Sequence, residues 1–104
     1  MNIIIGHTNM DMDCIASMVV ASRIFPGYRA IRSRLIHPVA KNLYNMMKKN
    51  LDFLSQSDID NESIENIVVV DTRSSQRIKE FSPLFARATG SVTVFDHHPD
   101  DSDD

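Results

Sequence analysis

Four short apolar runs, separated by longer segments with helical periodicity, limit what this chain of 104 residues can fold into. The runs lie at residues 2–5, 28–32, 67–70 and 92–95, and three of them are rich in Ile and Val. Strands that are apolar without alternation are buried on both faces, which is typical of parallel sheets covered by helices. We therefore predict an α/β fold with a doubly wound, mostly parallel sheet and helices on both faces.

Two segments between the first three runs have the periodicity of amphipathic helices. A wide apolar stripe predicts a helix over residues 11–24, which Pro26 and Gly27 end. Pro38 suits the first turn of a second helix, which we expect to end near Asn50. Its apolar positions, at i, i+4, i+7 and i+8, are Val39, Leu43, Met46 and Met47.

The second half of the chain is more polar between its runs. Residues 51–65 are acidic and predict a loop with a short turn of helix. Residues 75–85 predict a further helix, whose length Pro83 limits, and Gly90 separates it from the last strand. The order is then strand, helix, strand, helix, loop, strand, helix, strand.

Composition indicates one soluble domain, with 42% hydrophobic and 24% charged residues. A single cysteine, Cys14, cannot form an internal disulfide, so a reducing compartment is the default expectation. The apolar start at residues 3–5 is too short for a signal peptide or a membrane span. We expect a cytoplasmic protein that does not interact with membranes.

The formal net charge of −3 hides an uneven distribution. Residues 14–51 contain no acid and seven basic residues, which are Arg23, Arg29, Arg32, Arg34, Lys41, Lys48 and Lys49. Such a segment favours anionic partners such as phosphates or a nucleic acid strand. The alternative is a solvated face that is neutralised by the acids of residues 52–65.

Residues that commonly bind metals follow three of the predicted strands. They are His7, Asp11 and Asp13 after the first, Asp71 after the third, and Asp96, His97 and His98 after the last. In a parallel sheet these positions share the carboxyl edge, where ligands bind at the point of strand-order reversal. Carboxylates with some imidazole suit Mn²⁺ or Mg²⁺. Two such ions can activate water for attack on phosphorus and offset the charge on the phosphoryl oxygens.

Each of these elements also has a purely structural explanation. Asp11 and Asp13 could cap the following helix, and Asp71 could open a turn. A His-His pair is more often a surface or core feature than a ligand pair. The functional interpretation rests on the three groups sharing one sheet edge, where Asp71 has the position of a bridging carboxylate.

Three ordered motifs give the chain a resemblance to the DHH phosphoesterase superfamily. Residues 7–13, with Ala16 and Ser17 beyond, resemble its first motif, residues 68–72 its second, and residues 95–99 its third. Within that superfamily the chain looks most similar to DHH domains that are fused to CBS domains and a tRNA nucleotidyltransferase module.

The resemblance implies a site with two Mn²⁺ ions, with Mg²⁺ or Co²⁺ as alternatives. One metal would be held by His7, Asp11 and Asp71, and the other by Asp13, Asp71 and His97. The implied catalytic residues are Asp71, Asp96 and His98. His98 would face the substrate phosphate, which Arg73 could also contact, although a solvated turn is the structural alternative there. Asp96 would orient a neighbouring histidine. Cys14 takes a position where the family commonly has a small residue.

These features predict that residues 1–104 are an N-terminal fragment of a DHH phosphoesterase domain, with a disordered acidic tail at residues 99–104. The full-length protein would hydrolyse phosphodiester or phosphoanhydride bonds of nucleotides, oligonucleotides, polyphosphate or pyrophosphate. A fourth-motif Asp and a C-terminal lid domain would lie elsewhere in the same polypeptide, so we expect the fragment alone to be inactive. The alternative is a non-catalytic nucleotide- or metal-binding module of a larger protein. The oligomeric state stays open.

Overall fold

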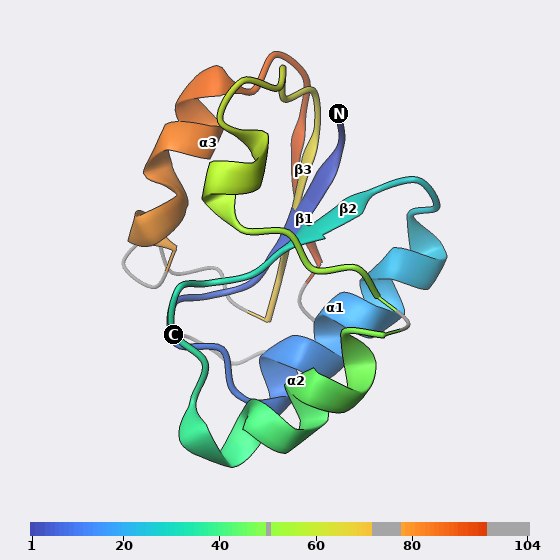
Figure 1. Ribbon diagram of the computed structural model, residues 1–104. Coiled ribbons are helices and arrows are strands. Elements are labelled where there is room, and N and C mark those ends of the chain that lie inside the picture. Colours follow the sequence, from blue (N-terminus) through green and yellow to red (C-terminus); the bar gives the residue numbers. More distant parts are fainter. Residues whose placement is uncertain (50, 72–77, 96–104) are drawn as a thin grey trace.

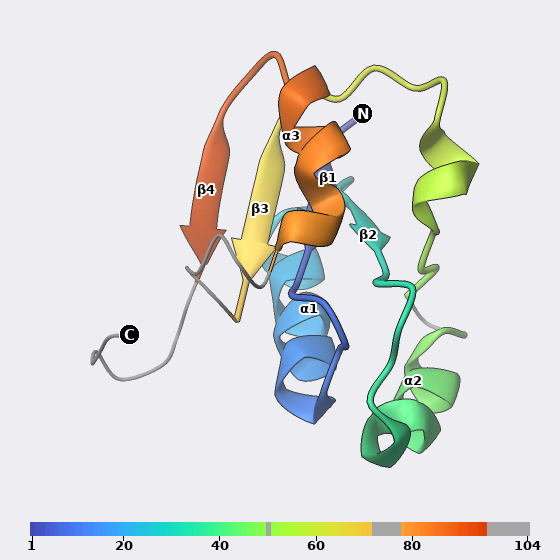
Figure 2. The same cartoon turned by 90° about the vertical axis from the view of Figure 1, so that its left-hand side faces the viewer.

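A parallel sheet with the strand order β2–β1–β3–β4 lies at the centre of the computed structural model, which describes residues 1–49, 51–71 and 78–95. The strands are β1 (Ile3–Ile5), β2 (Arg29–Ile31), β3 (Ile67–Val70) and β4 (Val92–Phe95). All three strand pairs are parallel, as Figure 2 shows. The chain goes from β1 to β2 on one side and then to β3 on the other, so the strand order reverses between β1 and β3.

Helices cover both faces of this sheet (Figure 1). On one face lie α1 (Met12–Ile24) and α2 (Lys41–Met47), which is preceded by the 3₁₀ turn η1 (Pro38–Ala40). On the other face lie η2 (Gln56–Ile59), η3 (Lys79–Phe81) and α3 (Ser82–Arg87). The predicted α/β architecture with helices on both faces is therefore confirmed.

Successive strand residues alternate between the two helical layers, as the period of a β-strand requires. Ile4, Val68 and Val70 pack in the cluster that contains α1, whereas Ile3 and Ile5 pack in the cluster with α3. All five side chains are buried. Burial on both faces explains why these runs show no polar alternation, and it fixes the position of the strand ends that carry His7 and Asp71.

The strand predictions agree closely with the structure in their bounds, and the two at 67–70 and 92–95 match residue for residue. The expected burial on both faces does not hold for β4, which ends the strand order and whose Val92 and Val94 are about half exposed. The predicted short helical turn within 51–65 is η2. Pro83 limits the α-helix at its start and not at its end: the proline lies in the first turn of α3, where its missing N–H costs nothing, and α3 extends beyond it to Arg87. The predicted helical residues before it, Lys79–Phe81, form the 3₁₀ turn η3 instead. The predicted helical residues 75–77 lie outside the described residues.

The predicted apolar face of the second helix was also wrong in part. Val39 and Met46 are 69% and 63% exposed, whereas Leu43 and Met47 pack against the α1 layer together with Ala40. The segment begins with η1 rather than with an α-helical turn. A 3₁₀ turn has about 3.0 residues instead of 3.6, so the phase of the helix differs from a uniform α-helical pattern. The helix also ends at Met47, before the predicted end near Asn50.

This difference can be tested with two identical substitutions one residue apart. We expect Met46→Ala to change the free energy of unfolding by less than about 0.5 kcal/mol, as at other exposed positions. Met47→Ala should cost about 1–2 kcal/mol, because its half-buried side chain contacts the core. Urea denaturation of both variants measures the difference, and equal losses would contradict the observed phase of α2.

No helix in the described part of the chain is both long enough and apolar enough to cross a membrane.

Candidate metal centre

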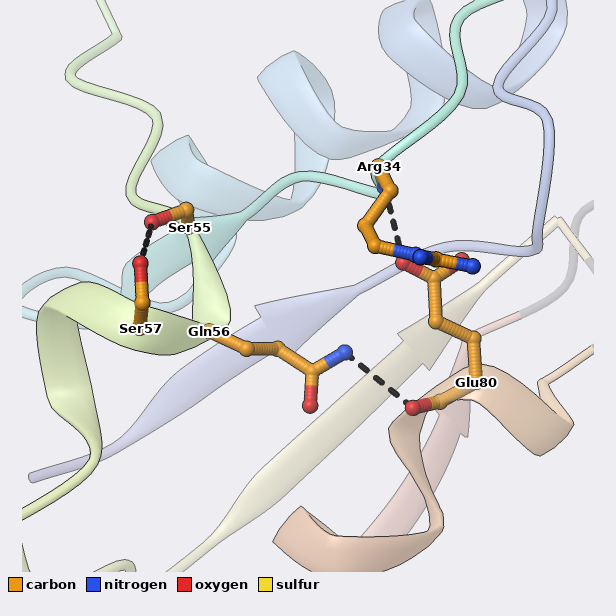
Figure 3. A pocket seen from close by; sticks show the side chains of 5 residues that line it. All are labelled: Arg34, Ser55, Gln56, Ser57 and Glu80. Carbon is orange, nitrogen blue, oxygen red and sulfur yellow. Dashed lines mark hydrogen bonds between the residues drawn. The ribbon is translucent and has the colours of Figure 1, made fainter.

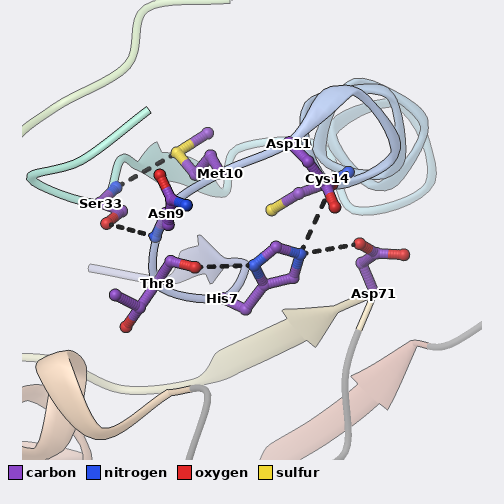
Figure 4. Close-up of polar contacts among 8 residues, drawn as sticks. All are labelled: His7, Thr8, Asn9, Met10, Asp11, Cys14, Ser33 and Asp71. Carbon is purple, nitrogen blue, oxygen red and sulfur yellow. Dashed lines mark hydrogen bonds and ion pairs between the residues drawn. The ribbon is translucent and has the colours of Figure 1, made fainter. Parts of the chain in front are cut away.

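The loop after β1 and the end of β3 bring three predicted site residues together at the carboxyl edge of the sheet. His7 lies in that loop, Asp11 ends it, and Asp71 directly follows Val70 (Figure 4). These two strand ends flank the reversal of strand order between β1 and β3. Open α/β sheets bind their ligands at such a reversal point.

His7 is nearly fully buried, and its ring orientation is fixed by its hydrogen bonds. Nδ1 lies 2.9 Å from the carbonyl oxygen of Thr8, which can only accept, so Nδ1 donates. In the neutral ring Nε2 then carries a lone pair, which is the tautomer found in metal-binding histidines. Nε2 lies 3.0 Å from Asp71 Oδ2 and 3.5 Å from Asp11 Oδ1. These atoms repel one another unless a second ring proton or a metal cation supplies positive charge between them.

Asp11 has two roles that the sequence presented as alternatives. It is the N-cap of α1, where its Oδ1 accepts a hydrogen bond of 2.9 Å from the backbone N–H of Cys14. The same oxygen faces His7 Nε2. Capping therefore orients this carboxylate toward the site instead of excluding it from the site.

Asp71 is buried and has a left-handed backbone conformation, with φ of +64°. Left-handed residues other than glycine are uncommon, and Asp and Asn are among those that tolerate the conformation best. Such residues cluster at functional sites, where the surrounding structure holds them. The turn at the end of β3 directs the Asp71 carboxylate toward His7.

The other predicted site residues are not brought into this cluster by the described part of the chain. Asp13 lies in the first turn of α1 and is exposed. Arg73, Asp96, His97 and His98 lie outside the described residues. The second metal site and the phosphate contacts therefore stay predictions.

The comparisons with known proteins give the family of the chain. The family model described as "DHH family, N-terminal domain" matches residues 2–104. The chain belongs to the DHH family. It is also 31% identical over 105 residues to an A-adding tRNA nucleotidyltransferase of Geobacter sulfurreducens. That alignment covers 100% of this chain and 12% of the relative, so the chain spans a small part of that protein. No solved structure matches the chain significantly.

Membership of the DHH family supports a phosphoesterase-type N-terminal domain and a metal-dependent chemistry. The donor set fits a divalent cation by its chemistry, because a histidine ring nitrogen faces two carboxylate oxygens at 3.0 and 3.5 Å. Of the three motifs that carry the resemblance, the structure describes the first completely and the second up to Asp71.

Cys14 lies close to His7 and Asp71, which the sequence did not lead us to expect. The residue was interpreted only as a small core residue, and it is fully buried. Its sulfur, however, forms a group with potential ligand atoms of His7 and Asp71 in which all atoms lie within 4.8 Å of one another. Its place three residues after Asp11, in the first turn of a helix that starts at the sheet edge, was the available signal.

A polar network holds the first DHH motif against the loop that follows β2. The backbone N–H of Asn9 donates to Ser33 Oγ at 3.2 Å, and Ser33 Oγ donates to Glu80 at 2.7 Å. Glu80 also accepts from the backbone N–H of Arg34 at 2.7 Å. Asn9 has a φ of +59°, so this hydrogen bond supports a second unusual backbone conformation near His7.

Glu80 also forms one wall of a polar hollow on the α3 side of the sheet (Figure 3). The other lining residues are Arg34, Ser55, Gln56 and Ser57. Gln56 donates to the carbonyl oxygen of Glu80 at 3.1 Å. At the edge of η2, hydrogen bonds from the backbone and side chain of Ser55 hold the pKa of the Asp58 carboxyl below its usual range. The hydrogen bond from Gln56 to Glu80 links η2 to η3.

The basic segment 14–51 is partly neutralised, as the structural alternative predicts. Arg29 forms an ion pair of 3.0 Å with Asp52, an acid of the 52–65 segment. Arg23, Arg34, Lys41, Lys48 and Lys49 are exposed. The positive charge therefore stays largely on the surface, where it contributes to the field around the molecule.

Proposed function

We propose that the full-length protein is a metal-dependent phosphoesterase that acts on phosphodiester or phosphoanhydride bonds. The observation that carries this proposal is the convergence of His7 Nε2 with carboxylate oxygens of Asp11 and Asp71 at the strand-order reversal. His7, Asp11 and Asp71 would hold one divalent ion, for which the resemblance implies Mn²⁺. Asp13 and His97 would belong to a second ion that shares Asp71.

When bound, such metal ions act as Lewis acids toward phosphoryl oxygens and make water a better nucleophile. The protein's part is to hold the ligands in place before the metal binds. The Thr8 carbonyl fixes the His7 tautomer, and the α1 cap fixes Asp11. Burial of His7 and Asp71 reduces competition from water for the same atoms.

Two observations favour a nucleotide or a short oligonucleotide as the substrate. The relative from Geobacter sulfurreducens is named for a transfer reaction on tRNA. The exposed basic residues of segment 14–51 would attract polyanions. Polyphosphate and pyrophosphate carry the same phosphoanhydride chemistry and belong in the same substrate tests. His98 and Arg73 are the residues that we propose to contact the substrate phosphate.

The name of that relative also favours a second candidate function. That relative is named as a nucleotidyltransferase, and this chain matches only 12% of its length. A DHH domain in such a protein could bind a nucleotide or metal without hydrolysing it. A bound nucleotide that stays intact for hours with Mn²⁺ present would support this second function.

The proposal predicts that His7→Gln removes hydrolysis by the full-length protein. Gln cannot present a ring nitrogen to Asp11 and Asp71, so metal binding and turnover should both fall by about 100-fold or more, beyond the usual effect of an outer-shell change. Product release from pyrophosphate, polyphosphate and short oligonucleotides, with Mn²⁺ added, measures the effect.

The matched control is His37→Gln, because His37 is exposed and accepts a hydrogen bond from the Val39 N–H at the start of η1. Activity should survive this substitution. If the Mn²⁺-loaded full-length protein released no product from any of the three substrates, the phosphoesterase proposal would be wrong.

A further inference from the structure

We propose that the Cys14 thiol is an additional ligand of the metal bound by His7 and Asp71, and that it shifts the metal preference of this site toward Zn²⁺ and Co²⁺. The inference rests on the proposed metal centre and concerns which ion the centre selects. It assigns a role to a side chain that otherwise looks like an ordinary part of the core.

The position of the sulfur is the first argument. Cys14, His7 and Asp71 are all buried, and each offers a ligand atom within 4.8 Å of the others. Figure 4 shows the Cys14 side chain beside the His7 ring, on the same side as Asp11. A nitrogen, an oxygen and a sulfur donor from three different segments thus surround one small volume at the sheet edge.

The main chain of Cys14 is tied to the same centre. Its N–H donates to Asp11 Oδ1, the oxygen that lies 3.5 Å from His7 Nε2. One residue therefore orients a carboxylate of the site through its backbone and directs its own sulfur to the site through its side chain. The first turn of α1 makes both contacts, so neither depends on a long mobile side chain.

Gly6, at the end of β1, leaves room for this sulfur because it has no side chain. A methyl group added at Gly6 would overlap Cys14 Sγ, so the sulfur lies directly against the β1 backbone. It is held between the end of β1 and the start of α1, one residue away from His7. This close approach limits the rotation of the side chain.

The metal preference of the Cys14 sulfur follows from its being a soft, polarisable ligand. Thiolate ligands select Zn²⁺ and similar ions, whereas sites of carboxylate, carbonyl and water suit Mn²⁺ and Mg²⁺. Zinc sites accept mixed sets of cysteine, histidine and carboxylate. Adding a sulfur to the histidine nitrogen and the Asp71 carboxylate beside it should therefore strengthen binding of Zn²⁺ and Co²⁺ much more than binding of Mn²⁺.

The competing explanation is that Cys14 only fills space. Buried cysteine often behaves as a small apolar residue, and Cys14 does pack in the core cluster with Met18 and Ala21. The two explanations predict different results for metal spectra and for metal preference, which do not depend on catalysis.

The test loads the full-length protein with Co²⁺ and records its absorption spectrum. The wild type should show an ultraviolet thiolate-to-cobalt charge-transfer band, which Cys14→Ala and Cys14→Ser should lose. Met18→Leu is the matched control, because it removes a buried sulfur from the same helix at nearly constant volume and should keep the band. In Cys14→Ala, Zn²⁺ affinity should fall by about 10- to 100-fold, with Mn²⁺ affinity changed by less than about threefold.

Three results would overturn the inference, and they are distinguishable. If Co²⁺ binds and needs His7 but the band and the Zn²⁺ affinity are the same in Cys14→Ala, the metal centre stands and Cys14 is only a core residue. If wild type and His7→Gln bind Co²⁺ equally weakly, the metal centre itself is wrong. Equal losses of Zn²⁺ and Mn²⁺ affinity in both Cys14 variants would also refute the selective role of the sulfur.

Discussion

Replacing Asp71 by asparagine should remove metal binding at the sheet edge and leave the fold intact. An asparagine side chain would keep the size of Asp71 and tolerate its left-handed backbone, which has a φ of +64°. It would lose the negative charge that faces His7 Nε2 at 3.0 Å. We expect the affinity for divalent ions to fall more than about 100-fold, and hydrolysis with it, since even outer-shell partners are worth about 10- to 100-fold.

Isothermal titration of the full-length protein with Mn²⁺ and Zn²⁺ measures this loss, and thermal unfolding without metal checks the fold. Asp60→Asn is a suitable control, because Asp60 is an exposed acid at the end of η2. This element lies on the face of the sheet opposite to α1. Asp71→Ala should bind metal equally poorly and also unfold more easily. Alanine adopts the left-handed conformation less readily than asparagine, at a cost of about 1 kcal/mol or more. Metal affinity retained in Asp71→Asn would contradict the assignment of Asp71 as a ligand.

The sheet and the first site residues were predictable because their determinants are local. The run 67–70 is apolar throughout and is buried on both faces, which is typical of strands inside a covered parallel sheet, whereas the similar run 92–95 forms an exposed strand. Once the strands are parallel, residues that directly follow them share one edge. His7, Asp11 and Asp71 needed no further information, since the strand order β2–β1–β3–β4 then places them at the reversal.

The features that sequence reasoning missed depend on how segments meet in three dimensions. The 3₁₀ turn η1 changed the phase of the following helix, so Val39 and Met46 face solvent. Pro83 was interpreted as the limit of a helix, although a proline at a helix start needs no N–H partner. The role of Cys14 near the site depends on the distance between the α1 start and the β3 end, which no periodicity in the sequence encodes.

Of the substitutions that add one methyl group near this site, Gly6→Ala should lower the stability of the fold most. The new methyl would overlap Cys14 Sγ, and the sulfur lies in a packed core with little room to rotate. We expect a loss of about 2–3 kcal/mol in the free energy of unfolding, as for other overpacked cores. Backbone strain does not contribute, because Gly6 is not in the left-handed region. Denaturant unfolding of the wild type and the variant gives the loss directly.

The double variant Gly6→Ala with Cys14→Ala separates this clash from any other effect of the new side chain. Without the sulfur, the nearest atoms to the methyl are Met18 Sδ at 3.6 Å and the Cβ of residue 14 at 3.8 Å, which are ordinary contacts. The double variant should therefore be more stable than the sum of the single changes by about 1–3 kcal/mol. Gly27→Ala is the control, since its φ of +86° makes the cost a backbone effect that Cys14→Ala cannot relieve. If the stability losses of Gly6→Ala and Cys14→Ala were additive, the sulfur of Cys14 would not lie against β1. Its position beside His7 would then also be wrong.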